Sequence, residues 1–176
     1  NNLDNFKIDH EEVMNSDEGL LKWLEKLHTF GLAILTNCPT KKNSAFKILN
    51  RISHIRETFF GTPFEVINIP KPNNTAYTAD ALRNHTDLPY YEYAPGYQFL
   101  HCLINDADGG MSSTIDGFAV ANHLRKEDAE TFNLLTNTFV KFKDEDYTQD
   151  KTRIFHSPLI TTTKDNDFND IRFSMA

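Results

Sequence analysis

The stretch SDEGLLKWLEKLHTFGLAILT, residues 16–36, reads as one helix followed by one strand. Ser16 is a favourable N-cap, and the two acidic residues after it suit the positive end of a helix dipole. Apolar residues then recur at helical spacing, at Leu20, Trp23, Leu24 and Leu27. We therefore predict a helix that ends near Gly31 and a short buried strand at 32–36.

A second helix is predicted to begin near Asn43 or Ser44. Apolar residues then repeat at helical spacing, at Phe46, Leu49, Ile52, Ile55 and Phe59. Gly61 follows where a helix C-terminus would fall. The next stretch, residues 62–87, contains three prolines and the pair Asn73-Asn74. This composition favours an irregular loop laid over a pocket.

The second half of the chain is predicted to be mostly strands. Helical connections are expected at 118–124 and 127–135, and strands at 97–104, 112–115, 153–163 and 171–174. The apolar run at 97–104 suggests a strand buried on both faces. Helices followed mainly by short strands predict an α+β chain whose core is an antiparallel sandwich of jelly-roll type.

Composition narrows the class of function. A chain of 176 residues with 39% apolar and 12% aromatic residues can bury one core, so we expect a single domain. The formal charge of −7 favours neither nucleic acid nor an anionic membrane, which leaves a small molecule as the expected partner. Because no apolar run approaches roughly 20 residues and no signal peptide is evident, we predict a cytoplasmic protein. Cys38 and Cys102 are expected to be small buried residues without a disulfide or zinc site.

The clearest chemical signal is His85-Thr86-Asp87. In an extended segment residues i and i+2 project to the same side, so an imidazole and a carboxylate can converge on one ion. Such a pair is two thirds of a two-histidine, one-carboxylate triad, which leaves three positions open on iron(II). Taken alone, the three residues more often represent a surface histidine beside a turn aspartate.

Several ordered motifs surround this pair. They are RETFFG at 56–61, NTAYT at 74–78, NHTDLPY at 84–90, APGYQFLHC at 94–102, GG at 109–110 and IDGF at 115–118. In this order and spacing the chain resembles the γ-butyrobetaine and trimethyllysine hydroxylases of the taurine-dioxygenase-like group. The resemblance extends over about residues 15–175.

The resemblance implies a double-stranded β-helix (jelly roll), Fe(II), 2-oxoglutarate as cosubstrate, dioxygen, and hydroxylation of a small trimethylammonium compound such as γ-butyrobetaine. His85 and Asp87 would bind the iron and be catalytic. Leu100 and Ser112 fall where family members contact 2-oxoglutarate, and Asn74 falls where a polar side chain faces cosubstrate or substrate. Core packing remains the alternative for Leu100, and a turn hydrogen bond remains the alternative for Ser112.

Phe60, Phe64 and Tyr77 fall where the betaine hydroxylases place aromatic rings around a trimethylammonium group. Aromatic faces attract a quaternary ammonium by about 0.5 to 2 kcal/mol per contact. The alternative for Phe60 is that it ends the apolar stripe of the second helix. The same chemistry on a sulfonate or another small acid, or an incomplete ligand-binding homologue, are the rival functions, and a homodimer is left open.

The family's second iron histidine and its 2-oxoglutarate-binding arginine would follow the strand at 171–173. We therefore expect residues 1–176 to form a partial oxygenase domain whose last strands, third ligand and arginine lie beyond Ala176. His101, His123 and His156 are expected to be structural. Arg172 is either a carboxylate clamp or, as we expect, a solvent-facing strand arginine.

Overall fold

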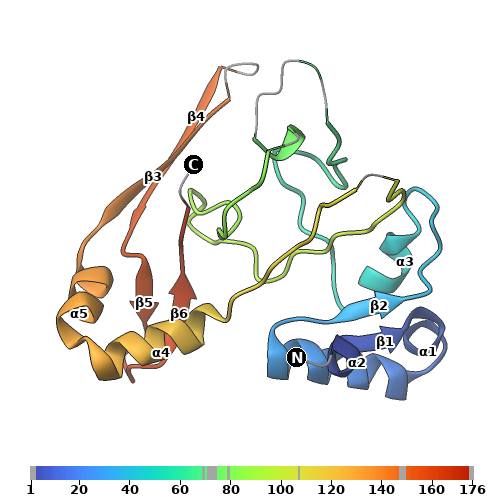
Figure 1. Cartoon of the computed structure of the whole chain (residues 1–176), viewed down its shortest axis with the longest axis horizontal. Coiled ribbons are helices and arrows are strands. Elements are labelled where there is room, and N and C mark those ends of the chain that lie inside the picture. Colours follow the sequence, from blue (N-terminus) through green and yellow to red (C-terminus); the bar gives the residue numbers. More distant parts are fainter. Residues whose placement is uncertain are drawn as a thin grey trace. The chain divides into compact units, whose positions relative to one another are not determined.

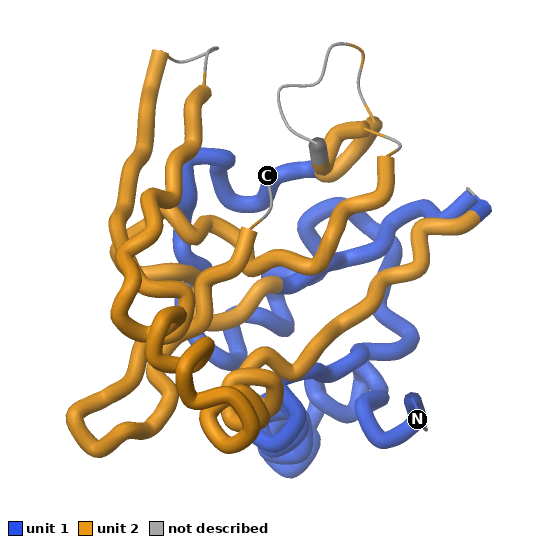
Figure 2. The backbone as a smooth tube through the Cα atoms, turned by 60° about the vertical axis from the view of Figure 1, so that its left-hand side comes forward, with its two compact units in different colours: residues 1–65, 99–108 blue, residues 66–98, 109–176 orange. Residues whose placement is uncertain are grey.

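The computed structural model describes residues 3–68, 70, 75–78, 80–106, 108–146 and 150–174, and it has the predicted α+β character (Figure 1). The chain divides into two compact units, residues 1–65 with 99–108 and residues 66–98 with 109–176 (Figure 2). The described strands pair only two by two. The jelly roll therefore stays a prediction.

The first unit is a small α/β cluster with a compact core. Its elements are η1 (Leu3–Phe6), β1 (Lys7–Asp9), α1 (His10–Asn15), α2 (Asp17–Phe30), β2 (Ile34–Thr36) and α3 (Ala45–Leu49). β1 and β2 pair in parallel from Lys7↔Ile34 to Asp9↔Thr36. The core beneath them consists of Ile8, Val13, Trp23, Leu27 and Ile48.

The helix predicted from residue 16 onward is confirmed as α2. The Ser16 hydroxyl accepts a hydrogen bond from the Gly19 backbone N–H at 2.9 Å, as an N-cap should. At the other end Gly31 adopts a left-handed conformation with φ of 65° and donates to the Leu27 carbonyl. The strand that follows is confirmed over its last three residues as β2.

The prediction of a long second helix is wrong, because α3 ends at Leu49. Ile48 is buried in the core, whereas Ile52, one turn later, is exposed. A short helix needs tertiary packing of its apolar face, and here that packing extends over one turn only. Gly61 does not end a helix; its N–H closes a turn on the Thr58 carbonyl at 2.9 Å.

The second unit combines two helices with two antiparallel hairpins. Its elements are η2 (Thr75–Tyr77), α4 (Gly117–Glu127), α5 (Ala129–Asn137), β3 (Val140–Asp146), β4 (Lys151–Ser157), β5 (Ile160–Thr162) and β6 (Phe168–Ile171). β3 pairs with β4, and β5 pairs with β6. α5 contacts β5 and α4 contacts β6, so both helices lie at the same end of the β5–β6 hairpin (Figure 1).

The two helical connections are confirmed as α4 and α5, whose N-termini are capped by Asp116 and Asp128. The predicted run 153–163 is divided between β4 and β5, and the last strand, β6, ends at Ile171. β3 was not predicted, because its alternation is filled by lysine and acidic side chains.

The strands predicted at 97–104 and 112–115 are wrong, since every residue in these two ranges is described and none is in a strand. The Leu100 side chain is 77% exposed rather than buried. An apolar run becomes a buried strand only where neighbouring strands accept and donate its backbone hydrogen bonds. Cys102 is exposed and Cys38 half-buried, so the expected burial of both is also wrong, although both are free thiols as predicted.

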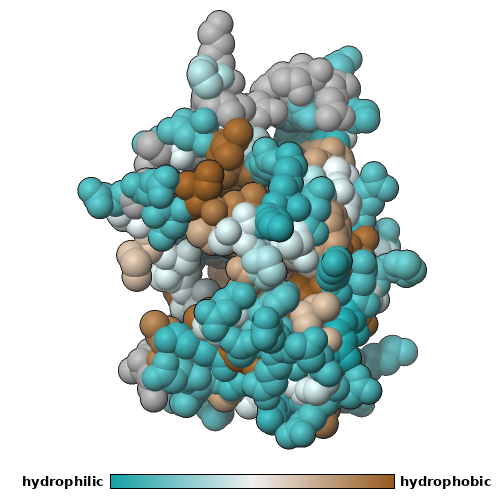
Figure 3. Space-filling view, turned by 90° about the vertical axis from the view of Figure 1, so that its right-hand side faces the viewer, coloured by the Kyte–Doolittle hydropathy of each residue, from teal (hydrophilic) through white to brown (hydrophobic). Residues whose placement is uncertain are grey.

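The molecular surface is mostly polar on the face drawn in Figure 3, with apolar side chains reaching it in places. Among the described residues, no helix combines the length and the apolar character needed to cross a membrane.

Candidate functional site

The structure brings His85 and Asp87 together in a segment without regular secondary structure. The His85 Nε2 atom lies 3.0 Å from the Asp87 Oδ1 atom, and the two side chains are 38% and 34% exposed. This is the convergence expected of residues i and i+2 in an extended segment. Both donor atoms are therefore close to each other and reachable from solvent.

The tautomer of His85 follows from its other ring nitrogen, which lies 2.6 Å from the Arg83 carbonyl oxygen. A carbonyl oxygen can only accept, so the Nδ1 atom carries a proton, and in the tautomer with this proton alone the Nε2 atom is an acceptor that faces Asp87. Two acceptors that face each other across 3.0 Å are stable only with a cation between them, either a proton or a metal ion.

The His85–Asp87 separation suits a metal ion. Two adjacent ligands on an octahedral ion, each about 2.1 Å from the metal, are separated by about 3.0 Å. The measured separation between His85 Nε2 and Asp87 Oδ1 is 3.0 Å. A ligating histidine commonly donates its second ring N–H to a backbone carbonyl, as His85 does here to Arg83. The pair thus fits two positions of a metal site.

Gln98 contacts the candidate pair, and sequence reasoning did not predict this contact. Its side-chain amide donates a hydrogen bond to the Asp87 Oδ2 atom. This contact leaves the Oδ1 atom of Asp87 directed toward His85. The sequence signals Gln98 only as a polar residue in the mainly apolar run 97–104, whose pattern predicts a buried strand.

Tyr90 lies just beyond the pair in the same segment. Burial, followed by the nearby Asp144 carboxylate, raises the pKa of the Tyr90 phenol well above its ordinary value. The phenol therefore stays protonated, and neutral, throughout the ordinary pH range.

The expectation that Arg172 faces solvent is wrong. Arg172 is 5% exposed, and its guanidinium donates to the backbone carbonyls of Pro89, Tyr91 and Glu92. A buried guanidinium needs several acceptors, and this segment supplies them.

The candidate cosubstrate residues are spread over both units. Leu100 belongs to the first unit, where its exposure makes the core-packing alternative wrong. Ser112 belongs to the second unit and is exposed in an irregular segment. Asn74 lies outside the described residues. Their contacts with a cosubstrate stay predictions.

The candidate substrate residues include a group of neighbouring, tilted aromatic rings in the first unit. The ring centroids of Phe60 and Phe64 are 5.0 Å apart at 33°, and those of Phe59 and Phe60 are 4.1 Å apart at 34°. Phe60 does not end a helix, so that alternative is wrong. Tyr77 lies in η2 of the second unit and is half-buried.

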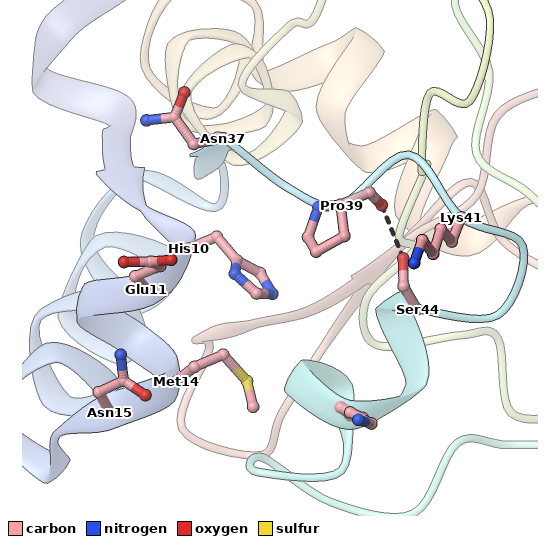
Figure 4. A pocket seen from close by; sticks show the side chains of 9 residues that line it. His10, Glu11, Met14, Asn15, Asn37, Pro39, Lys41 and Ser44 are labelled. Carbon is pink, nitrogen blue, oxygen red and sulfur yellow. Dashed lines mark hydrogen bonds between the residues drawn. The ribbon is translucent and has the colours of Figure 1, made fainter.

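A separate pocket in the first unit was not predicted. His10 and Met14 of α1 face the loop of Pro39 and Ser44, whose hydroxyl donates to the Pro39 carbonyl at 2.7 Å (Figure 4).

Within the part of the chain that is described, no three histidine, cysteine or acidic side chains gather as a metal site. His85 and Asp87 therefore remain a pair rather than a complete triad.

Comparison with known proteins places these motifs in context. The family model described as taurine catabolism dioxygenase TauD, TfdA family matches residues 3–172. The γ-butyrobetaine dioxygenase of Pseudomonas sp. (strain AK-1) is 41% identical over 166 residues, which cover 94% of this chain and 43% of that protein. The γ-butyrobetaine dioxygenase of Homo sapiens is 37% identical over 137 residues, 78% of this chain and 35% of that protein.

The mitochondrial trimethyllysine dioxygenase of Homo sapiens is 34% identical over 134 residues, which cover 76% of this chain and 32% of that protein. The chain thus spans less than half the length of each of these relatives.

Proposed function

Because this chain belongs to the taurine catabolism dioxygenase (TauD, TfdA) family, we propose that its protein is an Fe(II)- and 2-oxoglutarate-dependent dioxygenase. The proposed substrate is a small trimethylammonium compound, with γ-butyrobetaine first. The observation that carries the proposal is the 3.0 Å approach of His85 Nε2 to Asp87 Oδ1, with the His85 proton placed on the opposite nitrogen by Arg83.

His85 and Asp87 would hold the iron through Nε2 and Oδ1. Fe(II), when bound with 2-oxoglutarate, supplies the oxidising chemistry that turns a substrate C–H bond into an alcohol with dioxygen. The Arg83 carbonyl keeps the Nδ1 atom of His85 protonated, which leaves Nε2 available as a ligand. Gln98 occupies the outer oxygen of Asp87 and so orients the inner one.

The rest of the metal site is proposed to come from outside residues 1–176. This chain covers only 43% of the γ-butyrobetaine dioxygenase of Pseudomonas sp. (strain AK-1), which supports this source. The same source would supply the arginine for 2-oxoglutarate and the remaining strands of a jelly roll. That one family model spans both compact units supports their belonging to a single oxygenase domain.

Leu100, Ser112 and Asn74 are proposed to contact 2-oxoglutarate, with Asn74 also facing the substrate. Phe60, Phe64 and Tyr77 are proposed as the aromatic group for the trimethylammonium. The closeness of the Phe60 and Phe64 rings, whose centroids are 5.0 Å apart, supports this role, because two neighbouring rings can contact the same cation. Two relatives are named for γ-butyrobetaine and for trimethyllysine, both of which carry a quaternary ammonium.

Succinate formation tests the proposed reaction. We expect the intact protein, supplied with Fe(II), air and 2-oxoglutarate, to form succinate much faster with γ-butyrobetaine than without it. Taurine and 5,5-dimethylhexanoate, the uncharged-headgroup isostere of γ-butyrobetaine, serve as comparison substrates. Faster turnover with taurine would overturn the substrate, and no succinate under any condition would overturn the activity.

The aromatic group has its own test. Phe60→Leu should raise the KM for γ-butyrobetaine about 2- to 30-fold, the equivalent of roughly 0.5 to 2 kcal/mol for one cation–π contact. The neutral isostere should lose much less, since leucine preserves an apolar wall. Phe139→Leu, at an exposed phenylalanine of the second unit, is the control. Equal losses for the charged and neutral substrates would show that Phe60 contributes shape alone.

A further inference from the structure

Arg172, the residue after β6, is tied to the segment that follows the His85–Asp87 pair. Its Nη1 atom donates to the Pro89 carbonyl at 2.9 Å and to the Tyr91 carbonyl, and its Nη2 atom donates to the Glu92 carbonyl at 2.7 Å. These contacts span 80 to 83 positions of sequence. The end of β6 and residues 89–92 are therefore held together by one side chain.

The guanidinium of Arg172 is itself fixed from two other directions. Its Nε atom donates to Asp170 Oδ2 at 2.7 Å, and its carbon lies 4.5 Å from the centre of the Phe155 ring on β4. The hydrogen bonds use most of the five N–H donors of a guanidinium. Arg172 is thus engaged with protein groups of the second unit and is poorly suited to clamp a cosubstrate carboxylate.

Phe173, the residue after Arg172, contacts the residue that lies between His85 and Asp87. The Thr86 N–H donates to the Phe173 carbonyl at 2.7 Å, and the Phe173 N–H donates to the Thr86 hydroxyl at 3.0 Å. Thr86 is the residue between the two candidate ligands. Thr86 is therefore fixed to the exit of β6 by two reciprocal hydrogen bonds, one through its backbone and one through its side-chain hydroxyl.

These contacts matter because residues 85–87 have no helix or sheet hydrogen bonds of their own. The separation between His85 Nε2 and Asp87 Oδ1 depends on the backbone angles of these three residues. Phe173 fixes the middle of the segment, and Arg172 fixes its downstream side at 89–92. Removing a group that hydrogen-bonds a metal ligand directly costs about 10- to 100-fold in affinity or activity. Contacts that fix the backbone beside the ligands are expected to act in the same direction, with this range as their upper limit.

We infer that Arg172 is a positioning residue, which, together with the Phe173 backbone, holds His85 and Asp87 at the separation that a metal ion requires. The inference rests on the proposed function in one respect, namely that the pair binds metal. Lysine could not replace Arg172, since an ammonium lacks the planar fork that reaches several carbonyls at once.

Metal binding without turnover tests this role. In the intact protein, Co²⁺ affinity and the electronic spectrum of the Co²⁺-loaded form are measured for Arg172→Lys and Arg172→Met, at a temperature where each variant is folded. We expect affinity to fall, by up to about 10- to 100-fold, and the spectrum to change. Unchanged affinity and spectrum, with only a lower unfolding temperature, would make Arg172 a purely structural residue.

Arg125→Met is the matched control. Arg125 also belongs to the second unit, lies 4.0 Å from the centre of the Phe168 ring, and donates to the Asn166 carbonyl at 3.0 Å. Its loss should lower the unfolding temperature while leaving Co²⁺ affinity within about twofold of the wild type. An equal loss of affinity in Arg125→Met would mean that general destabilisation explains the Arg172 variants.

Thr86→Val tests the positioning of His85 and Asp87 if the Arg172 variants do not fold. It removes the hydroxyl that accepts from Phe173 and keeps both ligands and the branched side chain. Affinity for Co²⁺ should fall about fivefold, as for the loss of one hydrogen bond. Unchanged affinity would overturn the positioning role.

His85→Ala distinguishes a failure of the proposed metal site from a failure of the positioning role. If His85→Ala binds Co²⁺ as tightly as the wild type, the proposed metal site is wrong. If it loses binding while the Arg172 and Thr86 variants keep theirs, only the positioning role is wrong.

Discussion

His85→Ala is expected to abolish Fe(II)-dependent turnover and to lower metal affinity by more than the 10- to 100-fold that loss of a supporting contact costs. The imidazole Nε2 is one of the two donor atoms described at the site, so its removal leaves Asp87 alone. Stability should hardly change, because a side chain that is 38% exposed leaves no closed cavity when it is truncated. Iron titration and urea unfolding of the same sample measure the two effects.

Two histidines supply controls for this experiment. His123 on α4 and His156 on β4 are both exposed. His123→Ala and His156→Ala should bind iron and turn over like the wild type. A loss of iron binding in either variant would identify a ligand that the proposed site omits.

Asp87→Asn should be nearly as damaging as His85→Ala. The amide keeps the size of the side chain and can still accept from Gln98, but it lacks the negative charge that a hard cation prefers. Folding should be preserved, because the Asp87 side chain is 34% exposed and asparagine keeps its size. Retention of full turnover by Asp87→Asn would remove the carboxylate from the proposed ligand set.

Gly19→Ala is expected to destabilise the first unit by about 3 kcal/mol or more, at the upper end of overpacking costs. An added Cβ would lie 2.1 Å from the Glu12 carbonyl oxygen and 2.5 Å from its carbon. Both are backbone atoms, so relief requires α1 and α2 to separate. That movement would disturb the core around Val13 and Trp23, which is 1% exposed. Urea unfolding followed by Trp23 fluorescence measures the loss.

The sign of the stability change in Gly19→Ala distinguishes the clash with Glu12 from ordinary helix propensity. Alanine in a helix is ordinarily more stable than glycine by about 1 kcal/mol. Gly31→Ala is the control, since its added Cβ meets nothing within 4 Å and only the left-handed backbone, with φ of 65°, is strained. That strain costs about 1 to 2 kcal/mol. A gain of stability in Gly19→Ala would show that α1 and α2 do not approach each other as described.

Local signals predicted some elements well. α2 was found because its N-cap, its apolar spacing and its terminal glycine all lie within the element itself. The helix after Ser44 failed for the opposite reason, since it continues only while a core covers its apolar face. The strand at 97–104 failed likewise, because a strand exists only where other strands pair with it.

In the candidate site, too, local contacts could be predicted from the sequence and contacts between distant segments could not. The meeting of His85 with Asp87 could be predicted from sequence alone, because a spacing of two residues in an extended segment places both side chains on one side. Gln98 and Arg172 could not be predicted, since their partners lie 11 and more than 80 positions away and no local pattern marks them. Tertiary structure alone decided which polar side chains support the pair, because distant segments meet only when the whole unit folds.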